Sequence, residues 1–275
     1  MIGHLLREVR SGDRREAGVV LDEVGVEDLA ADVLLLEEDG LHVRAGRVQP
    51  SGEAGGTAAD DDELVLRHGI PFRSSLRLEH VSIPERFLAL GDSFTIGTGT
   101  TPERSFPAVL ADIWRERGRV IALTNPAVNG YATDDLIQEE LPLLAAIRPT
   151  LVTLLIGAND LVRGSTEDRY RSQLVRIHER IRADAPDARV IALPQPDWSL
   201  APAGAAFGDL DTTAGRIERF NAIAREEANR AGADWVDLFP LMREQGRLGS
   251  FAPDGLHPSA EAYAAWARRL AEIAS

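Results

Sequence analysis

The sequence predicts an α/β fold: a five-stranded parallel sheet with helices on both faces, preceded by a small β-rich module. From Arg86 onward, short apolar runs alternate with longer segments whose apolar residues recur at helical spacing, and this unit occurs five times. Successive β-then-α units fold into one parallel sheet. The length of 275 residues and the hydrophobic content of 44% allow a large core for such a sheet.

The five apolar runs are the predicted strands. The third is apolar almost throughout, which is typical of a central strand covered on both faces. In chain order the predicted strands span residues 87–90, 120–123, 151–156, 189–193 and 234–238.

Each predicted helix places apolar residues on one face. The second is expected to open at Thr133, as an N-cap before two aspartates, and the fourth to stop at Gly232. The apolar faces of the first, third, fourth and fifth helices are, in order, Phe106, Leu110, Ile113 and Trp114; Tyr170, Leu174, Ile177 and Ile181; Ile217, Phe220, Ile223 and Ala224; and Tyr263, Trp266, Ala267 and Leu270.

Residues 1–83 differ from this pattern and are expected to form an accessory module, which makes residues 84–275 the second domain. Apolar runs at 32–38 and 41–44 flank Asp39-Gly40, a dipeptide that favours a β-hairpin. Segments 64–67 and 76–81 also resemble strands, and the stretch 51–62 is rich in Gly, Ala and Asp, as loops are.

Composition excludes several kinds of chemistry. There is no Cys, so disulfides, thiolate metal sites and cysteine nucleophiles are excluded, and there is no Lys, so Schiff-base and P-loop lysine chemistry is excluded. The net charge of −14 argues against nucleic acid as a partner. The charged first residues and the absence of a long apolar run predict no membrane segment and a cytoplasmic protein. The sequence does not indicate an oligomeric state.

Ligands of parallel sheets bind beyond the carboxyl ends of the strands, so the residues that follow each strand are the candidates. Ser93 follows the first strand in Gly91-Asp92-Ser93, and Asp254 and His257 follow the fifth. A serine hydroxyl needs an adjacent base, and imidazole titrates in the right range. His257 is the predicted base, because the other histidine of this region, His178, lies in a helix beside a core position. Asp254 would orient the imidazole.

A tetrahedral intermediate on Ser93 would need hydrogen-bond donors for its oxyanion. We expect these to be the N–H groups of Ser93 and Gly130, which follow the first and second strands, and the side-chain amide of Asn159, which follows the third.

These segments resemble, in order, the sequence blocks of the SGNH (GDSL) hydrolase superfamily: Gly91-Asp92-Ser93 with Gly97, then Gly130, Gly157-Ala158-Asn159-Asp160, and Asp254-x-x-His257-Pro258. The resemblance covers residues 86–275. It implies a flavodoxin-like α/β/α fold, a triad of Ser93, His257 and Asp254, and an oxyanion hole of Ser93, Gly130 and Asn159. It also implies esterase, lipase, thioesterase or carbohydrate esterase activity, with no metal or cofactor.

Each candidate also has a structural alternative. Ser93 could be a helix N-cap, Asn159 a turn residue, and Asp254 with His257 a surface pair. The glycines at 97 and 99 could cradle a phosphate. Asp92 and Asp160 are expected to bond loop N–H groups, and Arg104 and Arg163 either meet an anionic substrate or are solvated.

The sequence thus predicts a serine hydrolase that cleaves a small or short-chain ester. Trp198 and Phe207, in the loop of residues 194–211, are expected either to line the substrate pocket or to anchor that loop. Two other functions stay open: a non-catalytic glycan- or partner-binding protein on a hydrolase-like platform, and an acyltransferase that uses the same acyl-enzyme.

Overall fold

The computed structural model describes residues 35–37, 40–42 and 84–274. The chain divides into two units, Met1–Ser75 and Leu76–Ser275, which are considered separately. In the first unit, β1 (Leu35–Glu37) pairs antiparallel with β2 (Gly40–His42), as the predicted hairpin requires. The other elements predicted for residues 1–83 lie outside the described residues, and the accessory module and its boundary stay predictions.

The second unit contains the predicted five-stranded parallel sheet. Its strands are β3 (Glu85–Gly91), β4 (Ile121–Thr124), β5 (Leu151–Leu155), β6 (Arg189–Ala192) and β7 (Asp234–Trp235). Their order in the sheet is β4-β3-β5-β6-β7. The chain therefore begins at β3, next to one edge, and forms that edge with β4. It then passes through β5 and β6 to the opposite edge, β7. This is the flavodoxin-like order, and it confirms the predicted fold class.

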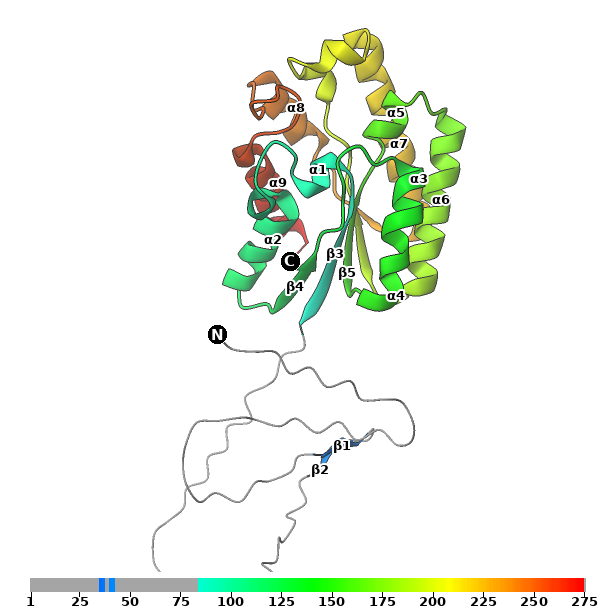
Figure 1. Ribbon diagram of the computed structural model, residues 1–275, viewed down its shortest axis with the longest axis vertical. Coiled ribbons are helices and arrows are strands. Elements are labelled where there is room, and N and C mark those ends of the chain that lie inside the picture. The colour runs from blue at the N-terminus through cyan, green and yellow to red at the C-terminus, as the bar shows by residue number, and fades with distance from the viewer. Residues whose placement is uncertain (1–34, 38–39, 43–83, 275) are drawn as a thin grey trace, which may run out of the picture. The chain divides into compact units, whose positions relative to one another are not determined.

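Helices cover both faces of the sheet (Figure 1). On one face lie α2 (Phe106–Glu116) and α9 (Ala260–Ile273), which pack together. The other face is covered by α3 (Thr133–Asp135), α4 (Leu144–Ile147), α6 (Glu167–Asp184) and α7 (Leu210–Ala231). Three further helices, α1 (Ser93–Ile96), α5 (Ala158–Val162) and α8 (Phe239–Arg247), follow β3, β5 and β7.

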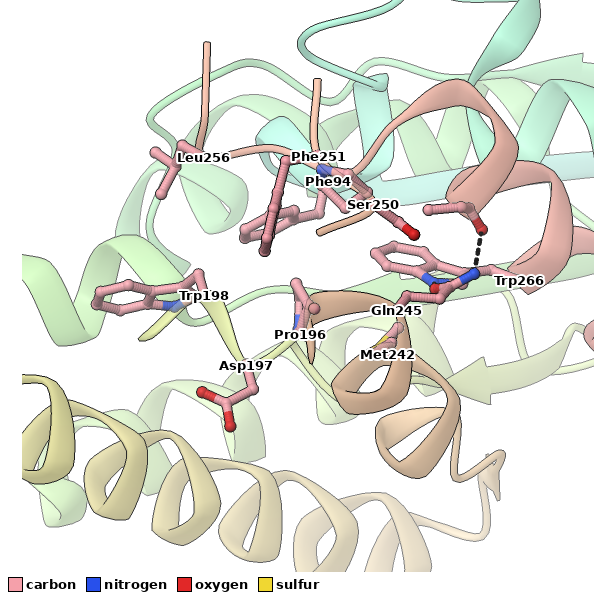
Figure 2. A pocket seen from close by; sticks show the side chains of 13 residues that line it. Phe94, Pro196, Asp197, Trp198, Met242, Gln245, Ser250, Phe251, Leu256 and Trp266 are labelled. Carbon is pink, nitrogen blue, oxygen red and sulfur yellow. Dashed lines mark hydrogen bonds between the residues drawn. The ribbon is translucent and has the colours of Figure 1, made fainter. Parts of the chain in front are cut away.

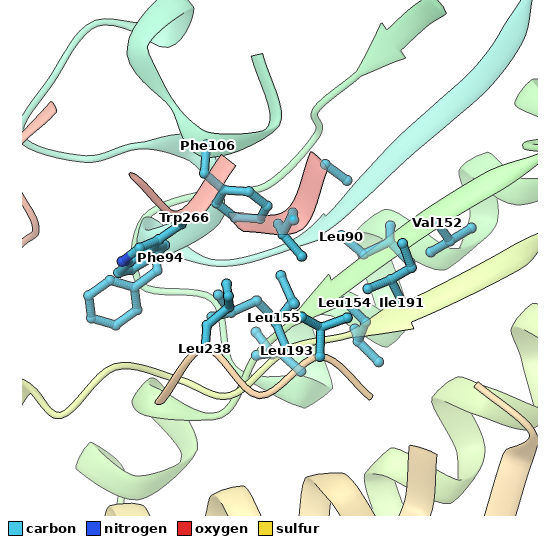
Figure 3. Close-up of a cluster of buried hydrophobic side chains, with 14 of the residues drawn as sticks. Leu90, Phe94, Phe106, Val152, Leu154, Leu155, Ile191, Leu193, Leu238 and Trp266 are labelled. Atoms are coloured by element: carbon cyan, nitrogen blue, oxygen red, sulfur yellow. The ribbon is translucent and has the colours of Figure 1, made fainter. Parts of the chain in front are cut away.

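The core lies between the sheet and its two helical layers. The apolar side chains of β5 are all buried, as expected for the central strand. Figure 3 shows buried side chains of β3, β5 and β6 in one apolar cluster with Phe106 of α2 and Trp266 of α9. The predicted apolar faces of α6 and α9 are buried in full, and on α7 Ala224 alone is only partly buried.

Several local expectations were wrong. The fifth strand ends at Trp235 because α8, which was not predicted, begins four residues later. The third and fourth strands end at Leu155 and Ala192, each one residue early, and the second is shifted by one residue, to Ile121–Thr124. The N-cap of α3 is Ala132, while Thr133 is its first residue and turns its hydroxyl to Asp160. The crossover after α3 is not one regular helix, since it continues as the π-helical stretch η2 (Leu136–Glu140) and the 3₁₀ turn η3 (Leu141–Leu143).

Within residues 84–274 and the two short N-terminal strands, no helix is both long enough and apolar enough to cross a membrane.

Tyr170 on α6 ties the helical layer to the end of β5. Its buried hydroxyl donates to the carbonyl of Ile156 at 2.8 Å, and its ring stacks on Phe220 with centroids 4.4 Å apart. We expect Tyr170→Phe to lower the free energy of unfolding by about 1–3 kcal/mol, because it leaves a buried carbonyl without its donor. Urea denaturation measures this loss. Tyr263→Phe is the matched control: its hydroxyl is equally buried but lies 3.4 Å from the Thr98 carbonyl. An equal loss in both variants would contradict the prediction.

Candidate active site

The predicted nucleophile lies at the sharp turn where β3 ends. Ser93 is the first residue of α1, and the Asp92 carboxylate caps this helix by accepting the N–H of Phe94 at 3.0 Å. Ser93 is therefore not the N-cap, and the predicted structural role of Asp92 is confirmed. Within the described part of the chain, the N–H of Ser93 donates no hydrogen bond. It is therefore free to bind a ligand at the carboxyl edge of the sheet.

Asp254 and His257 form an ion-pair-like contact in the loop before α9. Asp254 Oδ2 lies 2.8 Å from Nδ1 of His257, and Oδ1 accepts the N–H groups of Leu256 and His257 at 2.9 and 3.0 Å. The spacing of three residues allows one carboxylate to bind both the backbone and the ring. When Nδ1 carries the proton, Nε2 is left as the basic nitrogen.

The charged form of Asp254 is favoured. Its partial burial raises the pKa, but the two backbone N–H groups and the His257 imidazole outweigh that effect and hold the pKa below its usual value. The carboxylate thus stays ionised at neutral pH and can stabilise a protonated imidazole.

The loop after α1 brings the Ser93 segment to the Asp254–His257 pair. The rings of Phe94 and His257 are 5.5 Å apart between centroids. A Cβ at Gly99 would lie 3.4 Å from both Asp254 Oδ2 and His257 Cβ. No hydrogen bond joins the Ser93 hydroxyl to His257 within the described residues, and such bonds often tighten only when substrate binds.

The two other predicted donors lie on neighbouring loops. Gly130 has a φ of +90°, and its N–H donates no hydrogen bond to any of the described residues. The amide of Asn159, on α5, donates to the carbonyl of Tyr131 at 2.9 Å. A side-chain amide has two N–H groups, so one remains for a ligand.

Polar contacts fix these two loops to each other. Buried Asp160 accepts the N–H of Thr133 at 2.9 Å, and also bonds its hydroxyl, which confirms the structural role predicted for Asp160. Arg163 donates to the Gly130 carbonyl at 2.7 Å and pairs with Asp135 at 2.8 Å. Arg163 thus holds the Gly130 loop, whereas Arg104 pairs with Glu261 in an exposed position.

The glycine-rich segment after α1 does not cradle a phosphate. The N–H groups of Gly97 and Thr98 both donate to the Ser93 carbonyl, at 3.1 and 2.9 Å, and that of Thr100 donates to Gly97 at 3.0 Å. Donors already used within a turn are not available to an anion.

A small, mostly apolar pocket lies beside Leu256 and Pro258, the two neighbours of His257 in the chain (Figure 2). Phe94, Trp198 and the buried side chains of Met242 and Trp266 also line it, whereas Ser93, Asp254 and His257 do not. Phe207, the other predicted pocket residue, is not among the lining residues. It is half exposed and packs edge-on against Trp198, with centroids 5.6 Å apart.

Sequence reasoning missed one polar residue behind the site. Glu140, on η2, is buried, and its Oε2 accepts the N–H of Gly91 at 2.9 Å. No local pattern distinguishes it from its exposed neighbour Glu139, because its partner is 49 residues away.

Residues 89–265 match the model of the GDSL-like Lipase/Acylhydrolase family. This range spans β3 to α9 and holds all the candidate residues. The chain belongs to this family. The predicted superfamily and the predicted class of enzyme, an ester hydrolase, are therefore confirmed.

Two curated relatives of this GDSL protein are named as ester hydrolases. An arylesterase of Vibrio mimicus is 32% identical over 98 residues, which are 36% of this chain and 49% of the relative, so the match spans about half of that protein. The thioesterase 1/protease 1/lysophospholipase L1 of Escherichia coli K12 is 24% identical over 201 residues, or 72% of this chain and 88% of the relative.

Solved structures support the fold. The esterase EstA from Pseudoalteromonas sp., inhibited by monoethylphosphonate, aligns with a TM-score of 0.55 at 19% identity, over 68% of this chain and 95% of its own. Phospholipase A1 from Streptomyces albidoflavus aligns with a TM-score of 0.55 at 21% identity, over 69% and 99%.

Gly99 offers a test of how tightly the Asp254–His257 loop is held. In Gly99→Ala the new Cβ would lie 2.5 Å from that of Ala252, so the loop must move. We expect turnover of a nitrophenyl ester to fall about tenfold or more, since small displacements of catalytic groups are costly. Gly118→Ala is the control, with nearly the same φ of +86° against +87° but nothing within 4 Å. Equal turnover in the two variants would contradict this packing.

Proposed function

We propose that the protein is a serine esterase that forms an acyl-enzyme on Ser93, with His257 as general base and Asp254 as the residue that orients it. The observation that carries the proposal is the Asp254–His257 hydrogen bond of 2.8 Å on the loop that packs against the Ser93 segment. A carboxylate on Nδ1 leaves Nε2 to take the serine proton.

In the first half-reaction, Ser93 Oγ attacks the ester carbonyl carbon while its proton passes to Nε2 of His257. The tetrahedral intermediate then collapses, and the protonated His257 gives that proton to the departing alcohol oxygen. In the second half-reaction, His257 takes a proton from water as the water oxygen attacks the acyl carbon. The second tetrahedral intermediate then collapses, His257 returns the proton to Ser93 Oγ, and the acid is released. Asp254 stays ionised and stabilises the imidazolium that forms twice in each cycle.

The oxyanion is bound by the N–H groups of Ser93 and Gly130 and by the free N–H of the Asn159 amide. Support comes from the two backbone N–H groups, which have no acceptor among the described residues, and from the Tyr131 carbonyl, which fixes the Asn159 side chain. Donors fixed in advance stabilise a developing charge without reorganisation, and each contributes about 100- to 1,000-fold to turnover.

The substrate class that fits best is a short-chain ester. The pocket lined by Phe94, Trp198 and Leu256 is small and mostly apolar, which suits a short acyl chain, and buried Met242 and Trp266 form part of its wall. Side chains packed into the core move little, so a long chain cannot extend past them without disturbing the core.

The central roles can be tested by steady-state kinetics on nitrophenyl esters from acetyl to palmitoyl. We expect Ser93→Ala and His257→Ala each to lower turnover at least ~1,000-fold, because each removes a partner in the proton transfer. Ser165→Ala is the control, since this serine lies on the surface side of the loop after α5. Wild-type turnover in both active-site variants would refute the acyl-enzyme.

Trp198 is expected to limit acyl length. Trp198→Ala would enlarge the pocket, so the preferred ester should become longer by several carbons, as kcat/KM for the same series would show. Trp235→Ala, which removes an indole outside this pocket, should leave the preference unchanged. An unchanged preference in Trp198→Ala would mean that Trp198 only anchors its loop.

A further inference from the structure

A second buried carboxyl group lies behind the nucleophile turn. Glu140 is 1% exposed and ends the π-helical stretch η2, in the crossover between β4 and β5. Its Oε2 accepts the N–H of Gly91, the residue that ends β3, two positions before Ser93. The crossover is thus bonded directly to the turn that carries the nucleophile.

The sheet leaves this N–H without a strand partner on one side. β4 pairs with β3 only as far as Leu88, opposite Thr124, whereas β5 pairs with it up to Gly91. Glu140 therefore provides the acceptor that a longer β4 would have provided. π-helical turns are rare and often occur at functional sites, and this one buries Glu140 while Gln138 and Glu139 stay exposed.

Two carboxyl oxygens in this region receive no hydrogen bond from any residue that the structure describes. They are Oε1 of Glu140 and Oδ2 of Asp92, and both side chains are at most 1% exposed. Burial raises the pKa of Glu140 to about 8. The hydrogen bond from the Gly91 N–H lowers this pKa, and the charge of Asp92 raises it further. Burial also raises the pKa of Asp92 to about 7. When two buried carboxyl groups lie close enough to repel each other as anions, the state in which one of them is protonated and the other is ionised is favoured.

We propose that Glu140 is a positioning residue for Ser93: as a neutral acid it accepts the Gly91 N–H, and its proton removes the charge repulsion with Asp92. Asp92 accepts the Phe94 N–H, so the helix cap and the end of β3 are both fixed next to Ser93. This inference rests on the proposed role of Ser93.

The surrounding charges do not replace that proton. Of the elements packed against η2, β3 leads into Asp92, while Asp134 and Asp135 on α3 are paired with Arg169 and Arg163. The charge of Asp160 acts on Asp92 and raises its pKa further. When Glu140 ionises at alkaline pH, two adjacent carboxylates must repel each other, and the turn that carries Ser93 loosens.

Three variants test the proposal through kcat between pH 6 and 10. Glu140→Gln keeps an acceptor and a donor but cannot ionise, so we expect kcat within about twofold of wild type at pH 7 and loss of the decline near pH 8. Glu140→Ala removes the acceptor of the Gly91 N–H and should lower kcat about 10- to 100-fold with KM little changed. Glu139→Gln, at the exposed neighbouring carboxylate, should retain wild-type behaviour, including the decline.

Unfolding measured against pH gives an independent readout. The pKa of Glu140 is higher in the folded than in the unfolded chain, so its stabilising effect is complete below about 4.5 and is lost as pH rises through about 8. The melting temperature of Glu140→Gln relative to wild type should therefore increase from pH 5 to pH 9. If Glu140→Gln loses as much kcat as Glu140→Ala, or keeps the alkaline decline, the proposal is wrong. Full activity in Ser93→Ala would instead show that the proposed function has failed.

Discussion

The tight turn at Gly91 is the constraint on which the site depends. A Cβ there would lie 2.1 Å from Thr95 Oγ1 and 2.4 Å from the Leu155 carbonyl, so only glycine lets α1 pack so close to the end of β5. The chain leaves β3 abruptly, and Ser93 begins the next helix with an N–H that binds no acceptor in the part of the chain the structure describes. Because β3 is an interior strand of the sheet, this turn lies between the loops that follow β4 and β5.

Those loops are held by specific side-chain to backbone contacts rather than by regular secondary structure. Asp160 fixes Thr133, Asn159 binds the Tyr131 carbonyl, and Arg163 binds that of Gly130. Each of these residues follows β5 and contacts the loop after β4. Hydrogen bonds of this kind fix the two loops relative to each other before substrate arrives, which is what the proposed oxyanion hole requires.

Local signals predicted much of the fold and of the candidate site. Apolar runs placed β3 and β5, and Gly232 ends α7 with a left-handed φ of +77°, because strand burial and helix termination depend on adjacent residues. Because ligands bind beyond the carboxyl ends of parallel strands, Ser93 and Asn159 could be selected as candidates, and they do follow β3 and β5 directly. His257 was expected directly after the fifth strand, but α8 lies between β7 and His257. The π-helical stretch was not predictable, because it depends on contacts such as that of Glu140 with Gly91, far away in the sequence. Helix α8 was not predicted either, nor was the part of the pocket wall that Met242 of this helix forms.

The most direct test of the acyl-enzyme is to trap it chemically and locate the adduct. A fluorophosphonate reacts with an activated serine hydroxyl to give a stable phosphonyl ester, which intact mass and peptide mapping detect. One adduct per chain, on Ser93, that forms in wild type, is absent from Ser93→Ala and forms much more slowly in His257→Ala is the predicted result. Modification of a different residue, or equally fast labelling of Ser93 without His257, would contradict the mechanism.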